Sequence, residues 1–308
     1  TTARNEGDEV EILSGVFEGQ TTGTPISMIV RNKDQRSHDY GNIANTYRPG
    51  HADFGFDSKY GIRDYRGGGR SSGRETIGRV AAGAIAAKIL KELGITLQAY
   101  TSSIGPVFCQ TYHPEVIKEN SFYMPDMVAA KNAIKYLESC MRKDDSAGGV
   151  IECRINGVPA GIGDPVFGKL DAAFAQALMS IGAVKAVEIG DGSKVSTMKG
   201  SENNDGFHME NGKIVKTSNH SGGILGGISD GGEILLRAHI KPTPSISKPQ
   251  QTVTKTGEDI SIEIKGRHDP VIVPRAVVVV ESMAAITLVD AMFSNMSARM
   301  DYLKDFYL

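Results

Sequence analysis

Apolar residues recur at helical spacing in four places, and this pattern most narrows the folds open to the chain. One predicted helix follows Arg74 and ends near Gly94, and three others lie at residues 126–142, 167–181 and 274–296. The start of the last segment is rich enough in valine and alanine to be a strand. Its length and its lack of internal glycine favour a long buried helix.

Short apolar or alternating runs between these helices are typical of strands and hairpins. They lie at residues 10–19, 24–32, 148–163, 183–192, 232–242 and 258–266. Long helices among groups of strands predict an α+β fold, built as a layered body. No linker or repeat divides the chain, so we expect a single domain over residues 1–308.

The composition excludes several classes of protein. With 40% hydrophobic residues, 23% charged residues and a formal net charge of −2, the chain is neither basic enough for general nucleic-acid binding nor polar enough for disorder. No apolar run reaches the roughly 20 residues of a membrane span, and no leader sequence opens the chain. The three cysteines lack CxxC spacing, which fits a reducing compartment. We therefore expect a soluble, cytoplasmic protein with no metal site.

Positive charge is concentrated in residues 47–76, which read YRPGHADFGFDSKYGIRDYRGGGRSSGRET. One histidine, His51, stands among arginines, and the glycines at 67–69 let the backbone approach a ligand closely. Arginine forks, hydroxyl groups and the N-terminus of the following helix suit carboxylates and phosphates. A basic surface loop or an RGG-type nucleic-acid segment has the same local pattern, so this segment alone does not decide between them.

Two later segments add candidate ligand-binding groups. Residues 218–232 are rich in glycine and carry His220, which fits either a ligand-contacting loop or a pair of tight turns. Residues 239–249 place Lys241 and several hydroxyl groups among prolines that hold the backbone extended. That pattern suits a phosphate, and it also suits a solvated edge strand.

A third segment, KGRHDP at residues 265–270, brings a cation, an imidazole and a carboxylate together. Arg267 could hold an anion, and Asp269 could orient a ring nitrogen or exchange a proton with it, although such a triplet also makes ordinary surface ion pairs. By contrast, GDPVFGKL at residues 163–170 is a false phosphate-loop match. It ends in Leu170, where magnesium binding needs a hydroxyl group.

The order of these segments resembles the chorismate synthase family from end to end. The resemblance rests on the 47–76 segment, followed by GDPVFGKLDA, MSIGAVKAVEIGDG, GSENND, SNHSGGILGGIS, KPTPSISKP, and GRHDP before PRAVVVVESMAAITL. Loops match as well as the hydrophobic pattern, which makes the resemblance specific. It implies a β-α-β sandwich with a core of long helices between antiparallel sheets, assembled as a homotetramer.

The resemblance also implies an activity. Chorismate synthases are lyases of aromatic amino-acid biosynthesis, in the shikimate pathway. They convert 5-enolpyruvylshikimate 3-phosphate to chorismate and phosphate by a 1,4-anti-elimination, and they require reduced FMN without net oxidation. The flavin supplies the difficult chemistry, while the protein positions both ligands. The sequence shows no added reductase domain, so an external flavin reductant is expected.

Individual roles follow from the same resemblance. It places His51 at the reduced flavin and the substrate, and Asp269 near flavin N5, as the catalytic residues. Arg74, Arg267 and Arg4 would bind substrate anions. The implied flavin contacts are Arg70, Ser71, Ser72, Gly182, Ala183, Gly226, Lys241, Pro242, Thr243, Pro244, Ser245 and Arg267.

The sequence departs from the family pattern in two places. The INAVK motif reads IGAVK at residues 181–185, so Gly182 replaces an asparagine at a flavin-contact position. The family also begins with a GESHG segment and an arginine-rich stretch, and this chain opens at Thr1 beyond both. We therefore expect the natural protein to have roughly fifty more N-terminal residues.

Two other classes of function stay open on the residues alone. A phosphate-binding kinase or transferase would need a nucleotide and magnesium, for which residues 163–170 offer little. A nucleic-acid-binding module that uses RGGGR would lose affinity for oligonucleotides steeply as salt is raised.

Overall fold

An antiparallel sheet of five strands, in the order β6-β5-β7-β13-β8, lies at the centre of the molecule. The computed structural model describes residues 7–32, 43–65, 72–264 and 269–308. The strands of this sheet are β5 (Thr96–Ile104), β6 (Val107–Phe108), β7 (Gly149–Asn156), β8 (Val184–Ile189) and β13 (Ile234–Ile240).

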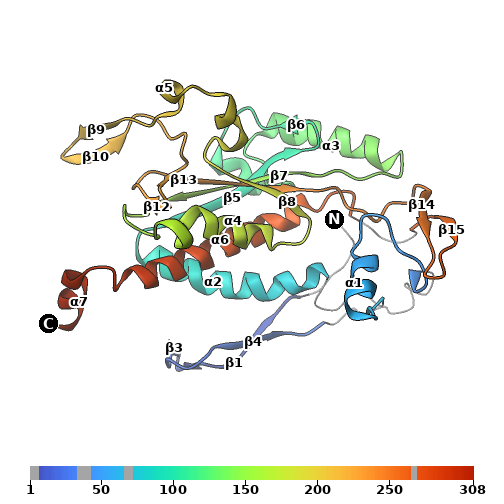
Figure 1. Cartoon of the computed structure of the whole chain (residues 1–308), viewed down its shortest axis with the longest axis horizontal. Helices are drawn as coiled ribbons and strands as arrows, with labels where there is room; N and C mark the ends of the chain where they lie inside the picture. Colours follow the sequence, from blue (N-terminus) through green and yellow to red (C-terminus); the bar gives the residue numbers. More distant parts are fainter. Residues whose placement is uncertain (1–6, 33–42, 66–71, 265–268) are drawn as a thin grey trace.

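Three helices cover one face of this sheet (Figure 1). They are α2 (Thr76–Glu92), α4 (Leu170–Met179) and α6 (Val273–Asn295), and α6 packs against both of the others. Alternate residues of β7, namely Ile151, Cys153 and Ile155, are fully buried in the same core as α6. The residues between them must point to the opposite face, because side chains alternate along a strand.

The predicted α+β class is confirmed, with an antiparallel sheet packed against long helices. All four predicted helices are present, the fourth being α3 (Met127–Met141), which lies beside β6. The segment that could have begun as a strand is helical throughout α6. Helix α4 is shorter than predicted, because residues Val166–Gly168 form a separate 3-10 turn before it.

Helix α6 is also long and apolar enough to cross a membrane by length and composition, with a mean hydropathy of 1.9. The core helix of a soluble protein passes the same test. Here α6 lies on the sheet between α2 and α4, and its Val280, Ala284 and Leu288 side chains are fully buried. A helix that is apolar around most of its circumference is expected in such a core position.

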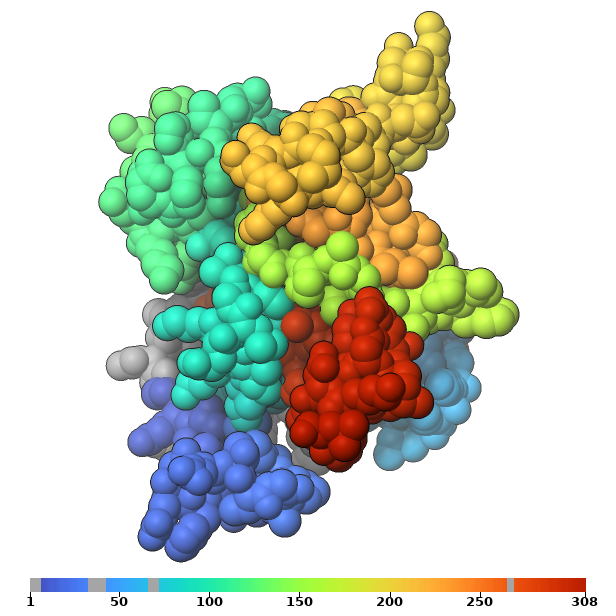
Figure 2. Space-filling view, turned by 90° about the vertical axis from the view of Figure 1, so that its left-hand side faces the viewer, coloured from blue at the N-terminus to red at the C-terminus, as the bar shows by residue number. Residues whose placement is uncertain are grey.

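Several smaller elements surround this body. The ribbon of β1 and β4 stands out from it, in dark blue in Figure 2. Near the other end of the molecule, α1 lies close to the hairpin of β14 and β15 (Figure 1). The bounds of these elements are β1 (Val10–Ser14), β2 (Val16–Phe17), β3 (Gln20–Thr21), β4 (Ser27–Val30), α1 (Asp53–Tyr60), α5 (Gly200–Asn203), β9 (Phe207–Glu210), β10 (Lys213–Lys216), β11 (Ile224–Leu225), β12 (Ile228–Ser229), β14 (Gln250–Val253), β15 (Asp259–Ile262) and α7 (Met300–Tyr307).

Two elements that bear on the site were not predicted, namely the central strand β5 and the peripheral helix α1. Strand β5 was missed because it carries polar residues inside the body: Thr101 and Ser103 are 0% and 1% exposed. Helix α1 was missed because its sequence, DFGFDSKY, contains glycine and has Asp53 as its only buried residue.

Candidate functional site

Two segments far apart in the sequence meet around His51. The His51 Nε2 atom lies 3.0 Å from the Ser245 hydroxyl oxygen, across 194 positions of the chain. Lys241 Nζ donates to the Gly50 carbonyl oxygen at 2.6 Å. A Cβ atom at Gly50 would lie only 2.7 Å from Pro244 Cβ, so the two backbones approach as closely as glycine allows. The structure thus joins the His51 loop to the KPTPS segment that follows β13.

The register of the central sheet brings a third segment to this place. Ile240, at the end of β13, pairs with Val184 at the start of β8. One residue further on, the Lys241 N–H donates to the Ala183 carbonyl oxygen at 2.9 Å. Ala183 therefore lies beside Lys241, with Gly182 next to it in the chain. Ala183 has a φ of 73°, which is uncommon for a residue with a side chain.

A fourth segment, carrying Asp269, lies against the same group. The Ala147 N–H donates to the Pro270 carbonyl oxygen at 2.8 Å, and the neighbouring Ser146 hydroxyl donates to the Thr243 carbonyl oxygen at 2.6 Å. Asp269 itself pairs with Arg275 Nε at 3.2 Å, at the start of α6. Sequence reasoning missed Arg275, because ion pairs across a turn have no fixed spacing.

The N-terminal part of α2, which follows Arg74, contacts the segment just before Gly182. Ser72 accepts a hydrogen bond from the Arg74 N–H at 3.3 Å and so begins the short turn before α2. One turn into α2, Arg79 donates to the Ser180 hydroxyl oxygen at 2.6 Å. Ser180 is two positions before Gly182. Arg74 is exposed, and its guanidinium makes no ion pair with another residue of the described ranges, which leaves it available for an anion.

Two arginines of the 47–76 segment are used inside the protein instead. Arg48 makes a bidentate pair with Asp53, with its Nε at 2.8 Å from Oδ2 and its Nη2 at 2.9 Å from Oδ1. Arg63 Nη1 lies 3.0 Å from the same Oδ2 atom. Burial alone would raise the pKa of Asp53, but the hydrogen bonds from Arg48 and the two nearby charges hold it below its usual value. The ion pair between Arg48 and Asp53 joins residues on either side of His51 and therefore fixes the loop that carries it.

Arg63 also ties this loop to its surroundings. Its side chain is 5% exposed, and Nη2 donates to three backbone carbonyl groups: those of Ile43, Ala44 and Thr46. The loop continues onto β14, where the Tyr47 N–H donates to the Val253 carbonyl oxygen at 3.2 Å. The arginine-rich pattern was interpreted as a single anion-binding cluster. Arg48 and Arg63 instead hold that cluster's backbone in place.

Among the described candidates, Gly226 does not join this group within one chain. Gly226 lies in the turn between β11 and β12, where the neighbouring Gly227 carbonyl accepts from the Leu170 N–H at 2.8 Å. Leu170 begins α4 and Ser180 follows its end, so α4 separates Gly226 from Ala183 by about 15 Å. Arg4, Arg70, Ser71 and Arg267 lie outside the described residues.

His220 lies in a polar cluster of its own. Its Nδ1 atom is 2.8 Å from Asp191 Oδ2. Asp191 follows the C-terminal end of β8, whereas the His51 group lies at the N-terminal end of that strand, at Val184. Nearby Lys216 is almost fully buried, 2.7 Å from Asp230 and 3.2 Å from Asp205. These contacts stabilise the glycine-rich segment at residues 218–232, in agreement with its interpretation as tight turns.

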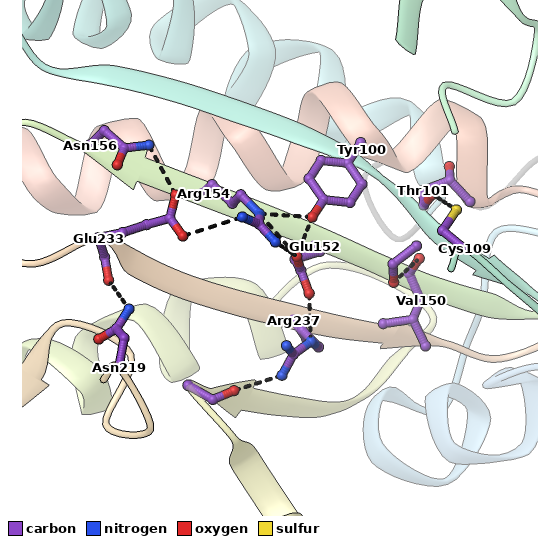
Figure 3. A network of polar contacts seen from close by, with 12 residues as sticks. Tyr100, Thr101, Cys109, Val150, Glu152, Arg154, Asn156, Asn219, Glu233 and Arg237 are labelled. Atoms are coloured by element: carbon purple, nitrogen blue, oxygen red, sulfur yellow. Dashed lines mark hydrogen bonds and ion pairs between the residues drawn. The ribbon is translucent and has the colours of Figure 1, made fainter. Parts of the chain in front are cut away.

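Sequence reasoning also missed a charged network on the open face of the sheet, shown in Figure 3. Glu152 on β7 accepts hydrogen bonds from Arg237 Nε at 2.6 Å, from Arg154 Nη2 at 3.1 Å and from the Tyr100 hydroxyl. Burial and the Glu152 charge raise the pKa of Tyr100. Glu152 and Arg154 alternate with apolar residues along β7, and this spacing could have indicated that both side chains lie on the same face of the sheet. Each guanidinium group has a second partner, Glu233 for Arg154 and the Gly190 carbonyl oxygen for Arg237, so this network stabilises the sheet.

Ammonium, hydroxyl and imidazole groups thus meet at one end of the sheet of an α+β protein, and these are the groups with which enzymes of this class bind small anions. The family model described as chorismate synthase matches residues 1–293. A chorismate synthase of Lachnoclostridium phytofermentans is 64% identical over 312 residues, which cover 100% of this chain and 84% of that protein. A chorismate synthase of Methanocella arvoryzae is 56% identical, over 96% of this chain and 81% of that protein.

A solved structure agrees with these relatives. A crystal structure of chorismate synthase superimposes with a TM-score of 0.75 and 31% identity, covering 96% of this chain and 82% of that one. The chain belongs to the chorismate synthase family. Its activity is therefore that of a carbon–oxygen lyase that eliminates phosphate from 5-enolpyruvylshikimate 3-phosphate to give chorismate, in a family that generally uses reduced FMN.

Proposed function

We propose that the segments meeting at His51 form one wall of the site where this chain binds reduced FMN and 5-enolpyruvylshikimate 3-phosphate. The contact between His51 and Ser245 carries the proposal, because it joins two segments that the family resemblance assigns separately to the ligands. The substrate bears two carboxylates and a phosphate. Arg74, with Arg4 and Arg267, supplies the bidentate donors that such anions require.

The residues present fit a flavin phosphate. The Thr243 hydroxyl oxygen is buried and has no hydrogen-bond partner among the residues that the structure describes. Buried hydroxyl groups are almost always paired, so this one fits a ligand that completes it. Thr243 lies between Lys241 and Ser245, and these three residues would hold FMN together with Ser72 and Ala183. The resemblance also implies contacts from Arg70, Ser71, Gly182, Pro242 and Pro244, whereas Gly226, which it names too, lies at the other end of α4 and is not part of this wall.

When bound, reduced FMN would supply the electron density that the elimination of phosphate requires. His51 holds or donates a proton beside it, because an imidazole changes charge near neutral pH. Asp269 takes part in proton exchange at the flavin, and Arg275 orients its carboxylate at 3.2 Å. We also place the enzyme in the cytoplasm as a homotetramer that depends on an external flavin reductant.

Anaerobic turnover of 5-enolpyruvylshikimate 3-phosphate with reduced FMN tests this assignment in the full-length protein. His51→Ala and Asp269→Ala should each lower kcat by about 10² to 10⁴-fold, the range for a lost acid or base. His208→Ala is the matched control, since His208 is exposed on the β9–β10 hairpin and should keep full activity. Unimpaired turnover by both site variants would overturn the assigned residues, and no chorismate from the unaltered protein would overturn the function.

A further inference from the structure

The structure points to Ser245 as a positioning residue that fixes the ring of His51, an inference that rests on the proposed role of His51. The Ser245 hydroxyl oxygen lies 3.0 Å from His51 Nε2, and Ser245 is 9% exposed. A partly buried hydrogen bond of this length constrains the direction of an imidazole ring. The family resemblance assigns Ser245 only a flavin contact.

The surrounding contacts hold both partners at this distance. Lys241 Nζ is bonded to the Gly50 carbonyl oxygen at 2.6 Å, next to His51 in the chain. Pro244 lies directly against Gly50, next to Ser245. Three contacts within five residues therefore fix the KPTPS segment to the His51 loop. Ser146 supports the segment from another direction through its bond to the Thr243 carbonyl oxygen.

The contact has two possible arrangements for a neutral ring, because a hydroxyl group can accept from an Nε2–H or donate to an unprotonated Nε2. A neutral imidazole carries its proton on either ring nitrogen, and hydrogen bonding selects which. The inferred arrangement is the one in which the Ser245 oxygen accepts from Nε2–H, because only that hydrogen bond is kept when the ring becomes an imidazolium, whose two nitrogens are both donors. The same bond therefore survives a change in the charge of His51. The ring stays in place as it gains or loses a proton, and the Ser245 hydroxyl hydrogen stays available to the flavin or its phosphate.

Magic-angle-spinning NMR of the full-length protein labelled with 15N-histidine tests this directly, with His51→Gln used to assign the signal. The neutral His51 ring should be the Nε2–H tautomer in the unaltered protein and a mixture of tautomers in Ser245→Ala. Ser245→Thr keeps the hydroxyl and should keep the single tautomer. In turnover assays, Ser245→Ala should lower kcat about tenfold with little change in the KM for the substrate, and Ser245→Thr should recover most of the rate.

Ser146→Ala is the control for general loosening, because it removes a bond to the same segment without touching His51. A shift of tautomer in Ser146→Ala equal to that in Ser245→Ala would overturn the proposal. So would an unchanged tautomer in Ser245→Ala, or an Nδ1–H tautomer in the unaltered protein. The NMR outcome does not depend on turnover, so full activity in His51→Ala would reject the proposed role of His51 while leaving the Ser245 contact to be judged separately.

Discussion

Single residues around His51 have roles that depend on where the chain places them. Gly50 has a φ of 71°, and its Cα faces Pro244 with no space for a side chain. Arg48 and Arg63 lie in the same arginine-rich segment as Arg74, but both form ion pairs with Asp53. Two arginines of the same segment therefore hold the backbone because a carboxylate lies beside them, whereas Arg74 makes no such ion pair with a residue that the structure describes.

Replacing Gly50 by alanine should therefore both strain the backbone and push the KPTPS segment away from His51. Gly61→Ala is the matched control: its φ is also 71°, but no atom lies within 4 Å of an added Cβ. Both variants should lose about 1 kcal/mol of unfolding free energy from the backbone term. Gly50→Ala should lose about 1–3 kcal/mol more through the clash and also lose turnover. Urea unfolding and kcat measure the two effects, and equal behaviour of the two variants would refute the close approach.

At the scale of elements, the spacing of apolar residues predicts where the helices lie but not how they pack. The apolar spacing of α2, α3 and α6 predicted their positions to within a few residues, because each helix buries a face in the core. Strand β5 was not predicted, because its polar residues are buried by neighbours rather than exposed. The close packing of α2 against α6 could not be predicted from the sequence either. It depends on Gly83, where an added Cβ would lie 2.3 Å from Ser282 Cβ.

Two glycines of α2 should respond in opposite ways to alanine. Gly78→Ala meets open space and should stabilise the protein by up to about 1 kcal/mol, since alanine is the better helix former. Gly83→Ala has the same propensity gain but should destabilise by about 1–3 kcal/mol, because α2 and α6 must move apart. Chemical denaturation of both variants measures the difference. A stabilising Gly83→Ala would show that the two helices are not in close contact.

Buried carboxylates distributed over the whole molecule couple its stability to pH. Asp53 fixes the His51 loop, Asp126 caps α3, and Asp205 holds the 218–232 segment. Burial opposes the charge of each, but hydrogen bonds outweigh it and lower all three pKa values. For Asp126 the donors are backbone N–H groups, including those of Val128, Ala129 and Gln110.

A carboxyl group whose pKa is lower in the folded protein stabilises it above the unfolded value and loses that effect as pH falls. The free energy of unfolding should therefore decline steadily below about pH 4, where unfolded aspartate begins to take up protons. Asp126→Asn should cost about 0.5–2 kcal/mol at neutral pH and make this decline shallower, because one coupled group is gone. Thermal unfolding from pH 7 to pH 2 measures both, and an unchanged acid slope in the variant would contradict the assignment.

The sequence by itself determined the class of fold, the long helices, and the ordered series of loops that mark the family. These are local properties, since periodicity reports which face is buried and a motif reports its own residues. Only the tertiary structure decided that His51 meets Ser245, that Ala183 meets Lys241, and that Gly226 lies at the far end of α4. Such contacts follow from sheet register and side-chain pairing between segments up to 194 positions apart, and no local spacing encodes them.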